Sequence, residues 1–107
     1  MLVVTTNDLP GYRIVQTLGV AKGLTVRSRS VVGNFKATIQ ILFGGTIPEY
    51  SKLAEQTRQE AFDKLIENAT AMGANAVLGF RYDANEIAAA VTEVLAYGTA
   101  VVVEKAA

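Results

Sequence analysis

The chain has 107 residues, of which 50% are hydrophobic, and ten Lys and Arg residues balance ten Asp and Glu residues. A chain of this length predicts a single domain, residues 1–107, and its hydrophobic content excludes an intrinsically disordered protein. The absence of cysteine and histidine excludes disulfides, thiolate chemistry, the preferred ligands of soft metals and the usual general base of enzymes. The zero net charge argues against nucleic-acid or anionic-membrane partners.

The N-terminal residues lack the basic start, apolar run and cleavage site of a signal peptide, so we expect a cytoplasmic protein without membrane spans. Leu2–Thr6 is β-branched and predicts a strand, which the turn residues Asn7–Gly11 end. Tyr12–Ser30 predicts either one long, bent strand or two strands across a turn, because Gly19 and Gly23 interrupt it.

The hydrophobic period changes to three and four residues over Val31–Phe43, which predicts an amphipathic helix ended by Gly44-Gly45. Thr46–Glu49 has the spacing of a capping box and predicts the start of a long helix over Pro48–Met72. On its polar face, Glu60 and Lys64 have the spacing of a favourable ion pair. The residues expected on its apolar face are Tyr50, Leu53, Ala54, Thr57, Ala61, Phe62, Leu65, Ala69 and Met72.

Ala76–Tyr82 alternates β-forming residues and predicts a strand. Asn85–Gly98 has an N-cap, alanines and a final glycine, which favour a helix. Its second half, however, leads directly into the strand-like run Thr99–Val103. The local pattern leaves both alternatives open.

Three segments together, Gly44-Gly45, Gly73–Gly79 and Tyr97–Val103, resemble the YbjQ-like family of bacterial and archaeal proteins. The resemblance covers essentially the whole chain, and Gly-Ala-Asn-Ala-Val is its most specific part. It implies an α+β, dodecin-like subunit with an antiparallel sheet, one long and one shorter helix packed on one side of it, and assembly into a pentameric ring. It also implies that Thr92–Val103 is a strand and that Ala84–Ala90 connects it to the preceding strand, with room for one helical turn.

The family is often labelled heavy-metal-binding, and this chain offers carboxylates but no soft ligand. Asp83 and Glu86 are close in sequence, and Glu93 is expected across the hairpin, so the three are weak candidates for a hard cation site. An ordinary solvated hairpin tip accounts for them more simply. We therefore predict that Zn²⁺, Cu²⁺ and Cd²⁺ bind no tighter than roughly tens of micromolar.

Other candidate sites have simpler structural explanations. Gly44–Thr46 could hold an anion, but helix capping already accounts for it. A basic stripe for nucleic acid would use four arginines, and a stacking surface for a flat ligand would use four tyrosines. Solvation and packing also explain these residues. These residues are Arg13, Arg27, Arg29, Arg81, Tyr12, Tyr50, Tyr82 and Tyr97. Catalysis has no support: Ser28, Ser30 and Ser51 lack a histidine partner, and Lys52 and Lys64 are expected on the polar helix face.

The main hypothesis is a non-enzymatic homo-oligomer, with no cofactor, that holds a small ligand between subunits; the ligand and the physiological role are unknown. The alternative is a metal-ion-binding protein, and a third hypothesis is an enzyme with an active site between subunits. Composition supports self-association independently of the resemblance, because so small a domain cannot bury this much apolar surface alone. Val101–Val103 is apolar on both strand faces, so a neighbouring subunit is expected to cover one of them.

Overall fold

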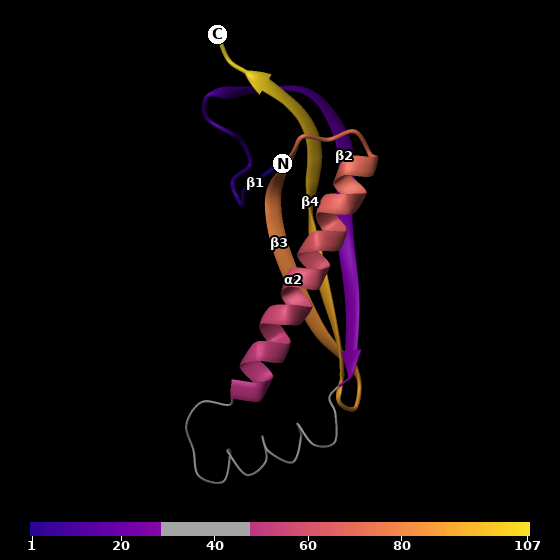
Figure 1. Cartoon of the computed structure of the whole chain (residues 1–107). Coiled ribbons are helices and arrows are strands. Elements are labelled where there is room, and N and C mark those ends of the chain that lie inside the picture. The colour runs from indigo at the N-terminus through magenta and orange to yellow at the C-terminus, as the bar shows by residue number, and fades with distance from the viewer. Residues whose placement is uncertain (29–47) are drawn as a thin grey trace.

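The computed structural model describes residues 1–28 and 48–107, which form one helix lying across a four-stranded sheet (Figure 1). The strands follow the spatial order β1-β3-β4-β2. The elements are β1 (Leu2–Val3), β2 (Tyr12–Ser28), α2 (Pro48–Ala71), β3 (Ala76–Ala88) and β4 (Val91–Lys105). The α+β class is therefore confirmed. The predicted shorter helix over Val31–Phe43 and the cap at Thr46 lie outside the described residues.

The resemblance implied a purely antiparallel sheet, but the sheet is mixed. Strands β2, β3 and β4 pair antiparallel, whereas the two residues of β1 pair parallel to β3, Leu2 opposite Ala76 and Val3 opposite Val77. The predicted first strand therefore exists but is shorter than Leu2–Thr6, because regular pairing with β3 ends at Val3 and only separate backbone hydrogen bonds follow.

Strand β2 is a single strand of 17 residues, so the first of the two alternatives for this region is correct. Its register with β4 shifts between Ile14 and Gln16 and again between Thr17 and Gly19. Such irregularities insert extra residues and bend a strand without ending it. Gly19 has a φ of +119°, a conformation that favours glycine.

Helix α2 confirms the predicted long helix, ending one residue before Met72. Its buried positions recur every four residues, at Thr57, Ala61, Leu65 and Ala69, and face the sheet. Most of these residues are small, and so is the residue that faces them on β2, Gly23. A Cβ on Gly23 would lie 2.2 Å from the Ala61 carbonyl oxygen. The helix backbone therefore rests almost directly on β2.

Several polar side chains of α2 bond to the sheet, whereas Gln59 Nε2 donates to Asp63 Oδ1 within the helix at 2.9 Å. The expected Glu60–Lys64 pair is wrong, because Glu60 pairs with Arg27 of β2 and Lys64 Nζ donates to the Leu24 carbonyl at 3.0 Å. Asn68 Nδ2 donates to the Lys22 carbonyl at 2.7 Å. These carbonyls belong to alternate residues of β2, which is an edge strand of the sheet, so α2 covers part of an edge that could otherwise pair with another chain.

The hairpin of β3 and β4 confirms the strand over Thr92–Val103 and corrects the predicted connection. Strand β3 runs on to Ala88, so most of Ala84–Ala90 is strand, paired with β4 from Ala84 opposite Val94 to Ala88 opposite Val91. Only Ala89 and Ala90 form the turn. Pairing with β4 outweighs the helix preference of the alanines, because intrinsic propensity is only a weak prior.

The N-terminal segment and the Gly-Ala-Asn run close the end of the sheet that is distant from this turn. The backbone after β1 stays bonded to β3, with Val4 N–H donating to the Val77 carbonyl at 3.0 Å and Gly79 N–H to Thr6 at 2.8 Å. Asn75 fixes the start of β3, since its side-chain amide both donates to and accepts from the backbone of Val103, each at 2.8 Å.

Candidate functional site

The face of the sheet opposite α2 is only partly covered. Toward the hairpin, β2 presents three large hydrophobic side chains on this face: Val20 is 69% exposed, Leu24 46% and Val26 52%. They lie opposite Thr99, Leu95 and Glu93 of β4, and Tyr97 between them is also exposed. We call this surface the open face: Val20, Leu24, Val26, Leu95 and Tyr97.

Much of the remainder of the same face is covered by the chain itself, although Ile14, opposite Val103, is 42% exposed. Val101 and Val103 are buried together with Ala76 and Leu78, and Val4, Leu9 and Tyr12 pack against them. The expectation that a neighbouring subunit must cover Val101–Val103 is therefore wrong, because the N-terminal segment does so. The uncovered apolar surface lies farther along the sheet, on the open face.

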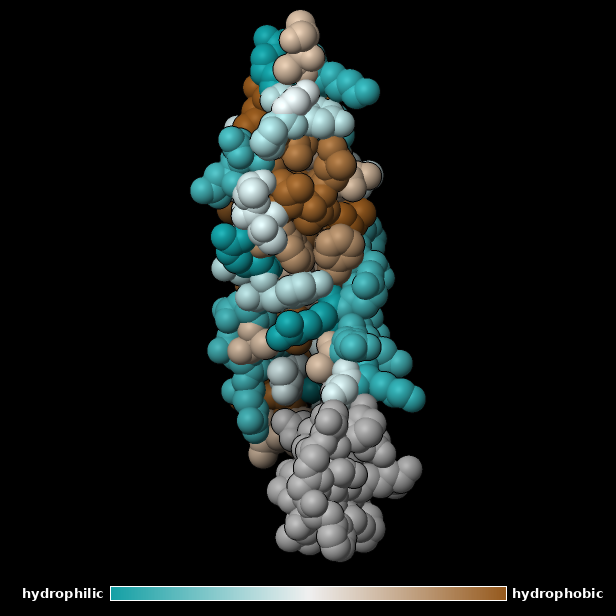
Figure 2. Space-filling model, turned by 90° about the vertical axis from the view of Figure 1, so that its left-hand side faces the viewer, coloured by the Kyte–Doolittle hydropathy of each residue, from teal (hydrophilic) through white to brown (hydrophobic). Residues whose placement is uncertain are grey.

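A second hydrophobic surface lies on another side of the subunit. Figure 2 views the molecule from the side of β1 and β3 and shows hydrophobic residues gathered in its upper half, with hydrophilic residues around them. In these strands Leu2 is 41% exposed, and Val3 and Phe80 are half-buried. The subunit thus carries apolar surface in two different places.

The three carboxylates proposed as weak metal ligands do not share one face. Glu93 lies opposite Asn85, two residues from Asp83, so Glu93 and Asp83 share the face of the sheet that is distant from α2. Glu86 lies opposite Thr92 on the other face, where it accepts a hydrogen bond from the Ala90 N–H. Within the described ranges no group of three or more Asp and Glu residues is placed to hold a metal ion. Isolated carboxylates do not fit a soft heavy metal, which prefers thiolate or imidazole ligands.

The arginines of the proposed basic stripe are engaged separately. Arg13 pairs with Glu104 and Arg27 with Glu60, and Arg81 donates to the backbone carbonyl of Thr5 at 3.0 Å. Arg29 lies outside the described residues. These bonds distribute the cations over separate places instead of one stripe.

The tyrosines also have separate environments. Tyr12 packs under the N-terminal segment, Tyr97 belongs to the open face, and the side chain of Tyr50 lies outside the described part of the chain. Tyr82 makes an edge-to-face contact with Phe80, whose ring centroid is 4.8 Å away. Burial is the main reason that the pKa of Tyr82 is raised from its usual value; Arg58 lowers this pKa and Asp63 raises it.

Three of the candidate catalytic residues, Ser28, Lys52 and Lys64, lie at separate places on β2 and α2. Ser28 ends β2 at an exposed position, Lys52 is exposed on α2, and Lys64 donates to the Leu24 carbonyl. Ser30 lies outside the described residues. Neither lysine is buried, so neither has the desolvation that would activate its amine.

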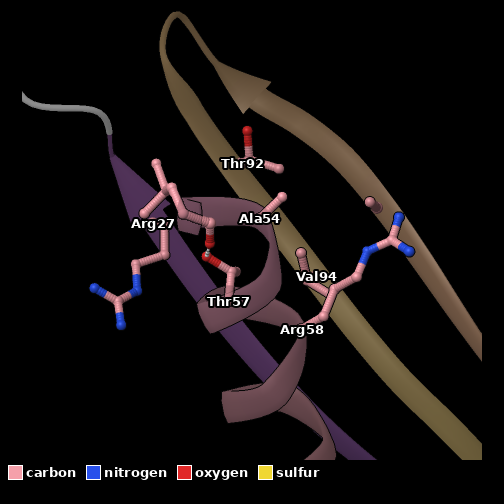
Figure 3. A pocket seen from close by; sticks show the side chains of 8 residues that line it. Arg27, Ala54, Thr57, Arg58, Thr92 and Val94 are labelled. Atoms are coloured by element: carbon pink, nitrogen blue, oxygen red, sulfur yellow. Dashed lines mark hydrogen bonds between the residues drawn. The ribbon is translucent and has the colours of Figure 1, made fainter. Parts of the chain in front are cut away.

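A cavity of about 220 Å³ separates the N-terminal half of α2 from the sheet (Figure 3). Two arginines line opposite sides of the cavity. Figure 3 shows the Arg58 side chain extending from α2 toward β3, whereas the Arg27 side chain extends in the opposite direction. The Thr57 hydroxyl donates to the Leu53 carbonyl at 2.6 Å within the helix. The lining residues are Arg27, Leu53, Ala54, Thr57, Arg58, Ala84, Thr92 and Val94.

Sequence reasoning missed this cavity. Helical periodicity places Leu53, Ala54 and Thr57 on the apolar face, but it does not reveal that α2 leaves space between itself and β3 here. The only local signal is the pair of small residues, Ala54 and Ala84, which leave the space unfilled from both sides.

Comparison with known proteins identifies relatives over nearly the whole chain. A family model described as "Putative heavy-metal-binding" matches residues 1–104. A UPF0145 protein of Burkholderia thailandensis is 61% identical over 100 residues, which are 94% of this chain and 90% of that protein. A UPF0145 protein of Burkholderia mallei is 59% identical over the same shares. None of these names states an enzymatic activity.

A crystal structure from Pediococcus pentosaceus, of a protein with unknown function assigned to the DUF74 family, has the same fold. Its TM-score is 0.65 at 19% identity, and the match covers 97% of this chain and 98% of that one. Within the part of the chain that the structure describes, no helix has both the length and the apolar character that a membrane span requires. From the family model and the Burkholderia relatives, the chain belongs to the YbjQ family of UPF0145 proteins, for which heavy-metal binding has been suggested.

Proposed function

We propose that the protein is a non-enzymatic, cytoplasmic subunit that performs its function as a homo-oligomer, assembled by burying the open face. The observation that carries this proposal is the open face itself. Val20, Leu24 and Val26 share one face of a regular part of β2, where only Lys22 stands between them. Isolated apolar side chains are common on surfaces, whereas groups of them mark interfaces.

The shape of the subunit supports the same proposal. Its principal extents are 58 × 24 × 16 Å, and its radius of gyration is 17.5 Å. A compact domain of roughly 100 residues has a radius of gyration of about 13 Å. Among the described residues, no second layer lies over the open face of this elongated, thin subunit, and a neighbouring copy can supply that layer.

Apolar surface in two different places favours a ring over a two-fold dimer. The open face and the exposed hydrophobic residues of β1 and β3 are different surfaces, and contact between unlike surfaces of identical subunits closes into a ring when the rotation permits. The resemblance to the YbjQ-like family implies five subunits. A small ligand between subunits remains a prediction.

The test is the mass in solution of three proteins by light scattering. The wild type is expected to show a mass of several 11.4 kDa chains, five according to the resemblance. Leu24→Asp places a charge on the open face and should yield folded monomer. Gln56→Asp adds the same charge at an exposed position of α2 and should keep the wild-type mass.

Circular dichroism separates loss of assembly from loss of folding in Leu24→Asp. A wild type with the mass of one chain at micromolar concentration would overturn the proposal. So would a Leu24→Asp protein that keeps both its helix signal and the wild-type mass.

The second candidate, metal-ion binding, rests on the family description, and the donor set of the chain argues against a soft metal. Calorimetric titration of chelator-free protein with Zn²⁺ and Cd²⁺ should show no sub-micromolar site. A stoichiometric sub-micromolar site that Asp83→Asn or Glu93→Gln removes would instead support a carboxylate centre shared between subunits.

A further inference from the structure

The cavity under α2 has the size, lining and charge of a small-molecule site. We propose that it binds a small monocarboxylate with a single ring or a short alkyl chain, whose acid group pairs with Arg58. The cavity lies on the α2 side of the sheet, opposite to the open face, so this inference does not depend on the proposed assembly.

The volume limits the ligand. An engineered apolar cavity of about 150 Å³ accommodates benzene. The cavity here, about 220 Å³, therefore has room for one ring with one small substituent.

The residues that line the cavity favour a ligand that is mostly apolar. Leu53, Ala54 and Val94 contribute only hydrocarbon, and Val94 is buried at 4% exposure. The Thr57 hydroxyl already donates to the Leu53 carbonyl, so it presents chiefly its methyl group and its acceptor lone pairs. Small-molecule sites typically combine such apolar walls with a few placed polar groups.

The charge selects an anion. Both ionisable residues that line the cavity are arginines, and no lining residue is acidic. Arg27 is already paired with Glu60, whereas neither ion pair of the described residues includes Arg58. Arg58 is therefore the guanidinium that can bind a carboxylate, which it matches with two parallel N–H donors.

Neighbouring aromatic residues hold Arg58 in place. Its guanidinium carbon lies 5.4 Å from the centroid of the Tyr82 ring, within the range of a cation–π contact. Tyr82 in turn packs on Phe80, which packs on Phe62 at 5.5 Å between ring centroids. This row of rings reduces the freedom that Arg58 would lose when an anion binds, because the side chain is partly ordered beforehand.

The test uses benzoate and benzyl alcohol as matched probes, titrated into the purified wild-type protein and followed by backbone amide NMR shifts. We expect benzoate to bind with a Kd of about 1 mM, in keeping with its few atoms, and to shift amides around Leu53–Arg58 and Thr92–Val94. Benzyl alcohol, which has the ring but no charge, should bind about five- to tenfold more weakly.

Two variants separate the charge from the cavity. Arg58→Gln should weaken benzoate about tenfold and leave benzyl alcohol unchanged, because only the charged bond is lost. Ala54→Leu fills the space from an exposed helix position and should abolish binding of both probes. Arg13→Gln removes an arginine that does not line the cavity and should change neither affinity.

Three results would overturn the inference. The first is no shift with benzoate at tens of millimolar. The second is a benzoate affinity that Arg58→Gln does not change. The third is a set of shifted amides on the open face instead of around the cavity. A wild type that proves monomeric yet binds benzoate as described would contradict the proposed assembly alone.

Discussion

The two faces of the sheet are completed in different ways. Under α2, small residues let the helix backbone approach the strand closely, and Ala61, Leu65 and Ala69 are fully buried. On the opposite face, the N-terminal segment covers Val101 and Val103, but the described residues leave Val20, Leu24 and Val26 exposed. Within residues 1–28 and 48–107, one side of the long sheet is therefore covered by α2, whereas part of the other side is left exposed.

Gly23→Ala should have the largest effect on stability, because it disrupts the packing of α2 on β2. The added Cβ would lie 2.2 Å from the Ala61 carbonyl oxygen and 2.4 Å from the Leu65 nitrogen, both helix backbone atoms that cannot rotate away. We expect a loss of about 3 kcal/mol or more in the free energy of unfolding, measured by urea denaturation at fixed protein concentration. Ser28→Ala, at the exposed end of the same strand, is the control; equal stability of the two variants would show that α2 does not rest on Gly23.

Asn75→Asp tests the covered end of the sheet. The carboxylate cannot donate to the Val103 carbonyl, and it places negative charge against that oxygen. The expected cost is about 1–3 kcal/mol in unfolding free energy, since one bond is lost and a carbonyl is left facing an anion. Asn68→Asp is the matched control on α2, with a single bond to Lys22 at an exposed position, and should cost less.

Ala90→Gly should stabilise the hairpin beside the open face. Ala90 has a φ of +60° in the turn between β3 and β4, a left-handed conformation that costs an alanine about 1 kcal/mol and a glycine little. The melting temperature should rise, whereas Ala89→Gly should not raise it. A fall in the melting temperature of Ala90→Gly would mean that the turn has another conformation.

Tyr82→Phe should have the smallest effect, the loss of a long, exposed hydrogen bond to the Arg58 carbonyl at 3.4 Å and of a pH dependence at high pH. Because burial raises the pKa of Tyr82 in the folded protein, the unfolded chain ionises first as the pH increases. This group therefore stabilises the fold equally at all pH values below its ordinary pKa of about 10, and the stabilisation is lost as the pH rises above that value. Thermal melts between pH 8 and 11 should show the wild type losing stability relative to Tyr82→Phe; parallel curves would contradict the shift.

Sequence reasoning succeeded where the structure depends on local pattern. The four-residue period predicts α2, and the β-branched run predicts β4. It failed where contacts with distant segments of the chain determine the structure. Ala84–Ala88 has the propensity of a helix, yet β4 pairs with it along its length, and the cover over Val101 comes from residues almost a full chain length away. Hydrophobic content indicates that apolar surface is left over, but only the register shows that it lies on the open face.

The most direct test of the account measures whether the open face is buried in solution. The chain has no cysteine, so V20C and E67C each introduce a single thiol, one on the open face and one on the exposed side of α2. If a neighbouring copy covers the open face, a thiol reagent should modify V20C at least about tenfold more slowly than E67C, and the difference should vanish when Leu24→Asp is added to V20C. Equal rates for V20C and E67C in the otherwise unaltered chain would show that the open face is free, and would contradict the account.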